Sequence, residues 1–455
     1  MKNFLFWVIL VIAVFLSLFA SGRIARDLPI DVRYILVPAA VLAATIAARI
    51  FMLNLTPQAV PVLYYHSIND ECLNPAWAHL SCPVRTFETQ MAYLKRRGFR
   101  AITLDQLHDH ILGRKILEEK SVVITFDDGF LDNWVYAFPI LKRLGLKGTV
   151  FLSTDFIDPK AGVRPTARHG EGRGSTRIES KGYLSWQEIE TMAKSGVFDF
   201  QSHASSHTWL FSSDRIVDFH HPNDCYFWLD WNYFPEHKPY WLTSYPVTPA
   251  PFGTPVFSHG KALEVTRFIE NPSFSAEIVS FVERNGGTAF FSKPGWKEDL
   301  TKHSQEIAVS VPPGRLETES ERNERLRGEL AGSRQIISSK LNASVNFLAW
   351  PGGGKNENSI RIALNDAGYL ATAGKGERNI PFGKASTFTR ISGGPMYTGK
   401  KSLIWDFLGF VAVVEVFRGN CFFYPLLFLV NRVGFLRRLA VKLQKKAASR
   451  TGSYE

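Results

Sequence analysis

The sequence predicts an α/β fold in which parallel strands alternate with helices, as a sheet or as a barrel. Two observations lead to this prediction. Short apolar segments rich in β-branched residues recur along the chain, and most are followed by segments with the apolar spacing of a helix. The alternation is lost from about residue 208 to 324 and then resumes. Strands connected through helices run parallel, so the pattern indicates a parallel α/β domain that carries an insertion.

The elements follow in order from local patterns. For the first helix, Phe87, Met91 and Leu94 have helical spacing, and Gly98 is a typical helix end. Strands are expected at 61–68, 101–104, within 121–129, and at 148–152, 197–201, 345–350 and 369–373. Helices are expected at 85–98, 105–117, 183–194, 329–341 and 359–368, and through Phe138, Ile140 and Leu144.

The stretch Ser121–Gly129 (SVVITFDDG) is the centre of the predicted domain. Its apolar, β-branched start suits a strand buried on both faces. Two carboxylates, Asp127 and Asp128, follow at once, and Gly129 permits a tight turn. Buried carboxylates are costly unless they are paired. A solvated Asp-Asp-Gly turn is the alternative interpretation.

A histidine pair follows another predicted strand. His203 and His207 are four residues apart, a spacing that would place both rings on one face of a helical turn, where they could bind one metal ion. Parallel α/β folds build their sites at the carboxyl ends of strands, where the acid pair also lies. One Asp and two His leave open positions for water and substrate, and the second Asp can act as a base.

The insertion, 208–324, is dense in aromatic residues and prolines. Aromatic rings suit sugar stacking or a membrane-interface belt. The simpler interpretation is that they form the insertion's own small core.

The N-terminal segment predicts two transmembrane helices. Phe4–Ala20 and Ile35–Leu53 are apolar runs of about the length that crosses a bilayer. Arg23, Arg26 and Arg33 lie between them, so the positive-inside rule places the connector in the cytoplasm and the globular part outside. A cleaved signal peptide is the alternative for the first run, but no clear small-x-small site follows it.

The basic charge is concentrated at the C-terminus. From Lys400 to Glu455 there are ten Lys or Arg against three Asp or Glu, in a chain of net charge +11. The rest of the chain is nearly balanced, which argues against a nucleic-acid-binding face. An interrupted apolar run at 403–430 precedes a basic helix at 432–446. We therefore expect a membrane-associated tail from 401 to 455.

The chain resembles the polysaccharide deacetylase (NodB-homology) family, the fourth family of carbohydrate esterases. Thr125–Gly129 (TFDDG) matches its first motif, and His203–His207 (HASSH) matches its second. Ala349–Gly353 (AWPGG) occupies the place of the third. Ala204 stands where the family usually has a small hydroxyl residue, so a supporting hydrogen bond is expected to be missing. The resemblance covers roughly 57–394, except for the insertion.

The resemblance implies a fold and a division into domains. The fold would be a distorted (β/α)7 barrel with a large insertion, an N-terminal transmembrane helical hairpin and a C-terminal membrane-associated tail. The expected divisions are 1–56 for the two transmembrane helices, 57–400 for the deacetylase domain with its insertion at about 208–324, and 401–455 for the tail.

The resemblance also implies roles for individual residues. Asp128, His203 and His207 would bind a divalent metal, with zinc as the expected ion. Asp127 would be the general base toward a water held by that metal. The implied reaction is hydrolysis of the acetamide of an N-acetylated sugar. The residues expected to line the substrate or its oxyanion are Gly129, Trp350, Gly352 and Arg390.

Two departures from the family pattern affect these roles. No arginine stands beside Trp350, and Arg390 is the candidate replacement that would orient Asp127. The family's late catalytic histidine has no counterpart, because His303 is the last histidine. His66, at the end of the first strand, is our choice of proton donor. Asp127 acting alone is one alternative, and the insertion histidines are the others: His220, His221, His237 and His259.

The sequence thus predicts a metal-dependent deacetylase of a polysaccharide or glycolipid, held at a bacterial inner membrane with its catalytic domain outside the cytoplasm. A polysaccharide synthase or export complex is the expected partner, and nucleic acid is not. The alternative is a catalytically degenerate glycan-binding or scaffold protein of an exopolysaccharide or cell-envelope assembly. Metal-dependent turnover distinguishes the enzyme from the glycan-binding protein, and deletion of residues 208–324, with assays of turnover and complex formation, separates a scaffold role from catalysis.

Overall fold

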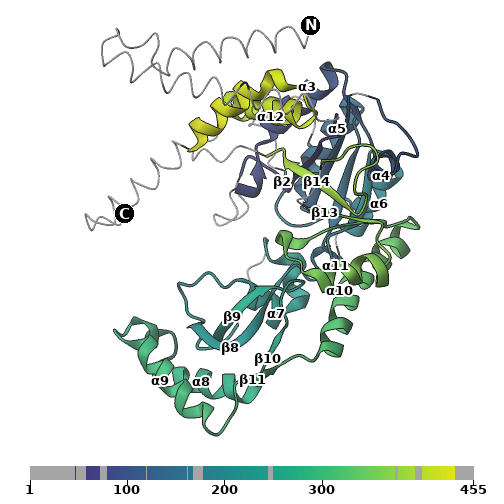
Figure 1. Cartoon of the computed structure of the whole chain (residues 1–455). Coiled ribbons are helices and arrows are strands. Elements are labelled where there is room, and N and C mark those ends of the chain that lie inside the picture. The colour runs from purple at the N-terminus through teal and green to yellow at the C-terminus, as the bar shows by residue number, and fades with distance from the viewer. Residues whose placement is uncertain are drawn as a thin grey trace, which may run out of the picture.

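The computed structural model describes residues 58–71, 79–118, 120–160, 162–167, 178–243, 250–374, 378–394 and 402–435, together with Ala47. Within these ranges, seven parallel strands close into a barrel (Figure 1). The order around the barrel is β1-β14-β13-β12-β7-β6-β5, and β5 pairs again with β1. The predicted barrel is confirmed. Its strands are β1 (Val62–Tyr65), β5 (Ser121–Asp128), β6 (Gly148–Leu152), β7 (Phe198–Ser202), β12 (Phe347–Ala349), β13 (Ala371–Gly374) and β14 (Thr387–Ser392).

The strand β5 is the most enclosed of these, since all eight of its residues are buried. One of its edges pairs with β1, in the register Val62↔Val123, after a short pairing with β4 (Arg100–Ala101). Its other edge pairs with β6 as far as Asp128↔Leu152. The apolar side chains of this strand are therefore buried on both faces of the barrel wall, as the sequence predicts.

The strands β7 and β12 are joined by very little backbone pairing. Only Leu348↔Ser202 pairs them, and the Gln201 side chain continues the contact. Its Oε1 accepts hydrogen bonds from the backbone N of Asn346, at 2.8 Å, and of Phe347, at 2.9 Å. Gln201 is only 1% exposed, so this amide satisfies two buried donors that a regular ladder would have paired. The distortion of the barrel is concentrated here.

Helices surround the barrel and largely follow the predicted spacing. Their bounds are α3 (Val84–Arg96), α4 (Leu104–Ile111), η2 (Asn133–Ala137), α5 (Phe138–Leu144), η3 (Thr154–Phe156), α6 (Trp186–Lys194), α10 (Glu319–Leu341), η6 (Pro351–Gly353), α11 (Glu357–Arg361) and η7 (Ile362–Asp366). The helix α4 ends earlier than predicted, and Gly113 follows it with φ 73°. The helix α10 begins ten residues earlier, because Thr318 and Glu321 form a capping box.

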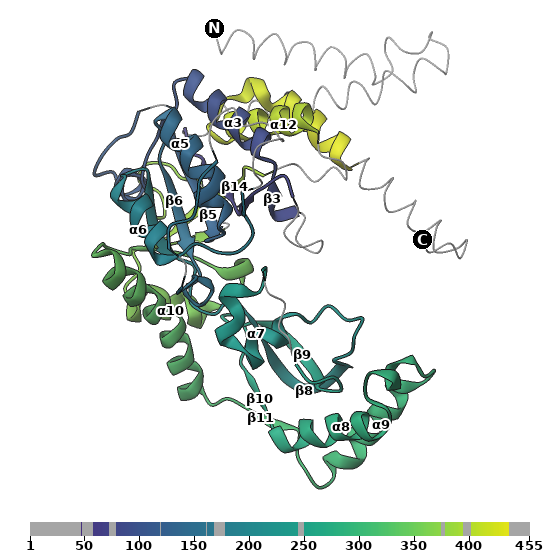
Figure 2. The ribbon, with the colours of Figure 1, turned by 180° about the vertical axis from the view of Figure 1, so that it is seen from behind.

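The insertion forms a second lobe below the barrel in Figures 1 and 2. It contains two antiparallel pairs with helices packed beside them. Its elements are β8 (Trp209–Phe219), α7 (Trp228–Tyr233), η4 (Pro235–Tyr240), β9 (Pro255–Lys261), β10 (Phe268–Glu270), α8 (Pro272–Arg284), η5 (Gly287–Ser292), α9 (Trp296–Ala308) and β11 (Gly314–Leu316). Its apolar core also includes Phe130, Phe156 and Tyr183, which belong to the barrel domain. The insertion's core is therefore continuous with the barrel.

The C-terminal helix α12 (Leu403–Phe417) packs on α3, at the opposite end of the molecule from the insertion (Figure 1). The Tyr93 hydroxyl donates to Glu415 Oε1 at 3.0 Å, and Arg418 Nη1 donates to Glu415 Oε2 at 3.0 Å. A short turn, η8 (Cys421–Phe423), leads to helical residues 424–435. A buried, fully paired carboxylate thus fixes this helix to the barrel.

Among the described residues, no helix combines the length and the apolar character needed to cross a membrane. The predicted hairpin, 4–20 and 35–53, lies outside the described residues except for Ala47. Membrane association of the 401–455 tail stays a prediction.

Candidate active site

Asp127 and Asp128 lie at the carboxyl end of β5, with side chains only 3% and 11% exposed. Asp128 and Gly129 both have left-handed backbones, with φ of 73° and 78°. A Cβ atom on Gly129 would lie 2.9 Å from Leu152 Cδ2, so a side chain at this left-handed position would be both strained and crowded. The two carboxylates are therefore fixed at the mouth of the barrel and must find partners there.

Arg390, on β14, is the partner of Asp127. Its Nη1 and Nη2 donate to the two carboxylate oxygens at 2.6 and 2.8 Å. The guanidinium is flanked by the rings of Tyr64 and Phe151, at 5.1 and 5.5 Å from their centroids. Burial alone would raise the pKa of Asp127, but Arg390 and the nearby histidines outweigh it, and the pKa lies below its ordinary value. Asp127 is therefore held ionised.

Asp128 lies against the histidine pair. Its Oδ1 is 3.2 Å from His203 Nε2 and 3.3 Å from His207 Nε2. Burial would raise the pKa of Asp128, but His207 and His203 hold it well below its ordinary value. His203 Nδ1 lies 2.8 Å from the Ala349 carbonyl oxygen, which directs Nε2 toward Asp128.

These three side chains fit a divalent cation. One ligand atom from each of Asp128, His203 and His207 lies within 4.8 Å of the other two. Asp128 Oδ1 is buried, and neither imidazole contact has hydrogen-bond geometry, so this oxygen has no hydrogen-bond partner. One carboxylate and two imidazoles are a donor set that zinc accepts, with positions left open.

The His203–His207 segment is a loop, so the predicted helical turn is wrong. Ala204 and His207 have left-handed backbones, with φ of 59° and 43°, and the two histidine rings meet at 5.1 Å between centroids. Support comes from neighbouring residues, because Ser202 Oγ accepts from Ala204 N at 3.1 Å. Glu329 Oε2 accepts from the loop's Ser206 N at 2.9 Å. The side chain of Ala204 has no hydroxyl to stabilise this loop, and the Ser202 hydroxyl does so by accepting from the backbone N of Ala204.

His66 is the histidine that the structure places near Asp127. Its Nε2 lies 3.8 Å from Asp127 Oδ2, and its side chain is 19% exposed. Burial is the main cause that lowers the pKa of His66, so the resting ring is neutral. The insertion histidines do not border the cavity described below: His220, His221, His237 and His259.

Asp132 holds the backbone that follows His66. Its carboxylate meets Ser67 Oγ at 2.5 Å and accepts from Ile68 N at 3.0 Å and Asn133 Nδ2 at 2.9 Å. Asn133 Nδ2 also donates to the His66 carbonyl at 2.9 Å. Asp132 is fully buried, and burial raises its pKa to about 7. No motif or spacing in the sequence distinguishes this carboxyl.

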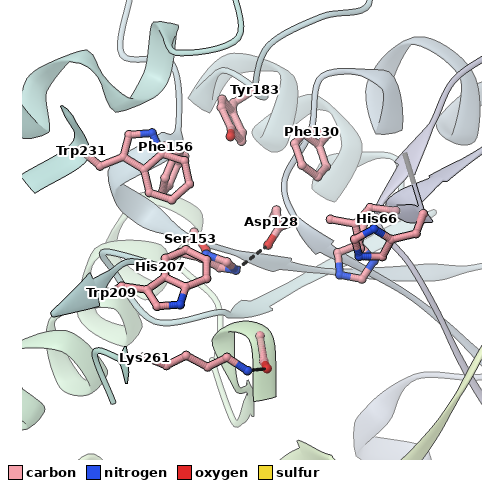
Figure 3. A pocket seen from close by; sticks show the side chains of 13 residues that line it. His66, Asp128, Phe130, Ser153, Phe156, Tyr183, His207, Trp209, Trp231 and Lys261 are labelled. Atoms are coloured by element: carbon pink, nitrogen blue, oxygen red, sulfur yellow. Dashed lines mark hydrogen bonds and ion pairs between the residues drawn. The ribbon is translucent and has the colours of Figure 1, made fainter. Parts of the chain in front are cut away.

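A cavity of about 300 Å³ opens beside the Asp128 cluster (Figure 3). Its lining residues come from the barrel, the insertion and the 79–80 segment: His66, His79, Leu80, Asp128, Phe130, Ser153, Phe156, Tyr183, His207, Trp209, Trp231, Lys261 and Gly352. Of the four residues expected to line the substrate or its oxyanion, Gly352 borders this cavity. Gly129, Trp350 and Arg390 do not border the cavity, and Trp350 is buried at 2% exposure.

The aromatic lining residues were missed as site residues. Nothing in the spacing of Phe156 or Tyr183 distinguishes them from core residues, and Trp231 sits in an insertion that could have formed its own core. Phe130, directly after Gly129, and Trp209, two residues after His207, did carry a positional signal.

Comparison with known proteins gives one matching family. Residues 114–223 match the family model "Polysaccharide deacetylase", a span that contains Asp127, Asp128, His203 and His207. The chain is 32% identical over 156 residues to "Putative polysaccharide deacetylase YxkH" of Bacillus subtilis (strain 168), covering 32% of this chain and 54% of that protein.

It is also 25% identical over 145 residues to "Poly-beta-1,6-N-acetyl-D-glucosamine N-deacetylase" of Escherichia coli (strain K12), covering 32% of this chain and 20% of that protein. The chain thus matches about half the length of the first relative and a fifth of the second. Among solved structures, a de-N-acetylase from Aggregatibacter actinomycetemcomitans matches with a TM-score of 0.45 and 16% identity, over 73% of this chain and 94% of that one.

Replacing Arg390 by Met should destabilise the fold by about 3–5 kcal/mol, because it leaves the buried Asp127 carboxylate without a counter-charge. Urea unfolding measures this change. Arg327→Met is the matched control, since its pair with Asp366 is 52% and 22% exposed and should matter by less than about 1 kcal/mol. Equal small losses in both variants would show that Arg390 does not compensate Asp127.

The raised pKa of Asp132 predicts a pH-dependent stability. The folded state keeps the proton up to about pH 7, whereas an unfolded Asp releases it near pH 4. The stabilisation is complete below about pH 4 and is lost as the pH rises through 7, by at most roughly 4 kcal/mol. Asp132→Asn should flatten the unfolding free energy over this range, while the exposed-site control Asp299→Asn should not. A wild-type slope in Asp132→Asn would contradict the assignment.

Proposed function

Because the chain carries a domain of the polysaccharide deacetylase family, we propose that it hydrolyses the N-acetyl group of an N-acetylated sugar in a polysaccharide or glycolipid. The observation that carries this proposal is the Asp128, His203 and His207 cluster beside the Asp127–Arg390 pair. In the reaction the amide C–N bond breaks, a C–O bond to water oxygen forms, and acetate and a free amine leave.

We propose zinc as the ion that Asp128, His203 and His207 bind, since one carboxylate and two imidazoles match its usual donors. A divalent cation bound there supplies Lewis-acid chemistry: it acidifies water and polarises the acyl carbonyl. The remaining tasks fall to the chain's own residues.

Asp127 is the proposed general base. Its carboxylate is adjacent in sequence to Asp128, and Arg390 lowers its pKa, so it is ionised and ready to accept a proton from the attacking water. Arg390 also fixes the orientation of both carboxylate oxygens, so it is a positioning residue. The proposed donor to the developing oxyanion is the backbone N–H of Gly352, which borders the cavity, or that of Gly129.

His66 is the proposed route by which the proton reaches the leaving amine. Its neutral ring can accept a proton, and its Nε2 is 3.8 Å from Asp127 Oδ2, a distance that a small shift would close. The proton taken from water by Asp127 would pass through His66 to the nitrogen. If Asp127 delivers the proton directly, His66→Gln will keep most of the turnover.

The chain should release acetate from N-acetylglucosamine oligomers when zinc is present. Chelation with EDTA should abolish the release, and added zinc should restore it, because the cluster is the proposed Lewis-acid site. His203→Ala and His207→Ala should lose the metal by elemental analysis, while His237→Ala, whose side chain is 50% exposed, should keep it. Full turnover after chelation would contradict the proposal, and oligomer binding without acetate release would favour the glycan-binding alternative.

We also propose that the chain works at a bacterial inner membrane with the barrel outside the cytoplasm, next to a polysaccharide synthase or export complex. Support comes from the two apolar runs of the sequence, 4–20 and 35–53, and from apolar side chains exposed on the C-terminal helices. These are Ile404, Phe422, Leu429 and Phe435. Fractionation of the full chain with membranes, and a smaller membrane-bound fraction when residues 1–56 are removed, tests the anchoring by the two apolar runs. Equal release of both forms would contradict it.

A further inference from the structure

The insertion contributes an aromatic wall to the cavity. Five rings form a continuous series, which we call the aromatic arc: Phe130, Tyr183, Phe156, Trp231 and Trp209. Successive ring centroids are 5.3, 4.9, 5.0 and 6.3 Å apart. In Figure 3 the Trp209, Trp231 and Phe156 end of the arc lies across Asp128 from His66. The barrel supplies the first three rings and the insertion the last two.

Trp209 is the member of the arc that can offer a ring face. The other four rings are only 2–3% exposed, so they mainly pack against one another: Phe130, Tyr183, Phe156 and Trp231. Trp209 is half-buried and lies 6.5 Å from the His207 ring, directly beside the proposed metal ligands. A sugar whose acetamide lies at the Asp128 cluster would therefore find Trp209 as its nearest flat apolar surface.

Lys261 shares this side of the cavity with Trp209. The two residues are directly opposite in the antiparallel β8–β9 pair, in the register Trp209↔Lys261, so both side chains project from the same face of that ribbon. Lys261 Nζ donates to the Gly352 carbonyl, which leaves two of its three N–H donors for a ligand. An apolar ring face beside free donors is the chemistry that a pyranose, with one apolar face and equatorial hydroxyls, requires.

The insertion is held firmly enough to serve as a wall. A Cβ atom on Gly354 would lie 2.4 Å from Lys261 Cβ, so the glycine-rich loop after Pro351 lets the lysine stem cross it closely. A second contact is made by the 3%-exposed Lys238, which donates to Asp155 Oδ2 and to the Ser206 carbonyl, both at 3.0 Å. The insertion thus contacts both loops that border the metal ligands.

We propose that Trp209 and Lys261 form a sugar-binding subsite that the insertion adds to the barrel, with an N-acetylated pyranose as its ligand. This inference rests on the proposed function for the position of the acetamide. Trp209 stacks on the sugar ring and Lys261 donates to its hydroxyls. The insertion is then a specificity-determining part of the site, in addition to having a core of its own.

Calorimetric titration with a β-1,6-linked N-acetylglucosamine tetramer tests the subsite without turnover, in an Asp127→Asn background. Trp209→Ala should weaken binding by about tenfold or more, Trp209→Phe should recover most of it, and Lys261→Met should also weaken it. Trp296→Ala, a tryptophan in α9 that does not border the cavity, should bind like the parent. Unchanged binding by Trp209→Ala, or no binding by the parent, would overturn the proposal.

Hydrolysis of 4-nitrophenyl acetate separates recognition from chemistry, because this small ester needs no sugar subsite. Trp209→Ala should lose about tenfold in kcat/KM on the tetramer and clearly less on the ester, while Trp296→Ala should keep both rates. Equal losses on both substrates would show that Trp209 only supports the fold of the site. If the wild-type chain binds the tetramer but releases no acetate, the proposed function fails while the subsite stands.

Discussion

The structure depends on how the barrel compensates two carboxylates buried side by side at the end of β5. Neither Asp127 nor Asp128 can be ionised there at low cost unless positive or polar groups surround it. Arg390 compensates the first through two hydrogen bonds, and the two imidazoles lie against the second. These partners reach β5 because β14 closes the barrel against β1 and because the loop after β7 ends in the same mouth. The closed barrel therefore brings these partners to the two carboxylates.

The same arrangement gives two identical side chains different environments. Asp127 is oriented by a guanidinium that lies between the Tyr64 and Phe151 rings, so it has little freedom to turn toward a cation. Asp128 keeps a buried oxygen without a hydrogen-bond partner, aimed at two ring nitrogens. A cation is the partner that such an oxygen lacks. The division of labour between base and ligand therefore follows from their neighbours and from the left-handed turn at Asp128.

The local parts of this account could be predicted from the sequence, and the non-local parts only partly. The buried strand β5 and the Asp and His pairs follow from short patterns in the chain. The strand β14 was not predicted as a strand, because its alternation of Thr, Phe, Thr, Arg and Ile is short and follows a loop. Arg390 was suggested only by the absence of an arginine beside Trp350. After Pro351, the Lys261 stem occupies the space that a side chain at Gly352 or Gly354 would need.

The insertion shows why aromatic content alone could not be interpreted. Its rings do form a core, as the simpler interpretation held, yet that core extends through Phe156 and Tyr183 to the cavity wall. Packing and recognition use the same residues here, and a sequence pattern cannot separate them. The histidine pair also could not be placed from its spacing alone. A loop with two left-handed residues brings the rings together where a helical turn was expected.

The central claim is that adjacent, chemically identical carboxylates have separate tasks, and a paired measurement of Asp127→Asn and Asp128→Asn tests it most directly. Both variants are purified with zinc and compared for bound metal by elemental analysis and for acetate release from N-acetylglucosamine oligomers. The account predicts that Asp127→Asn retains the metal and loses turnover, while Asp128→Asn loses the metal and turnover together. Metal loss in Asp127→Asn with metal retained in Asp128→Asn, or turnover that survives in Asp127→Asn, would contradict it.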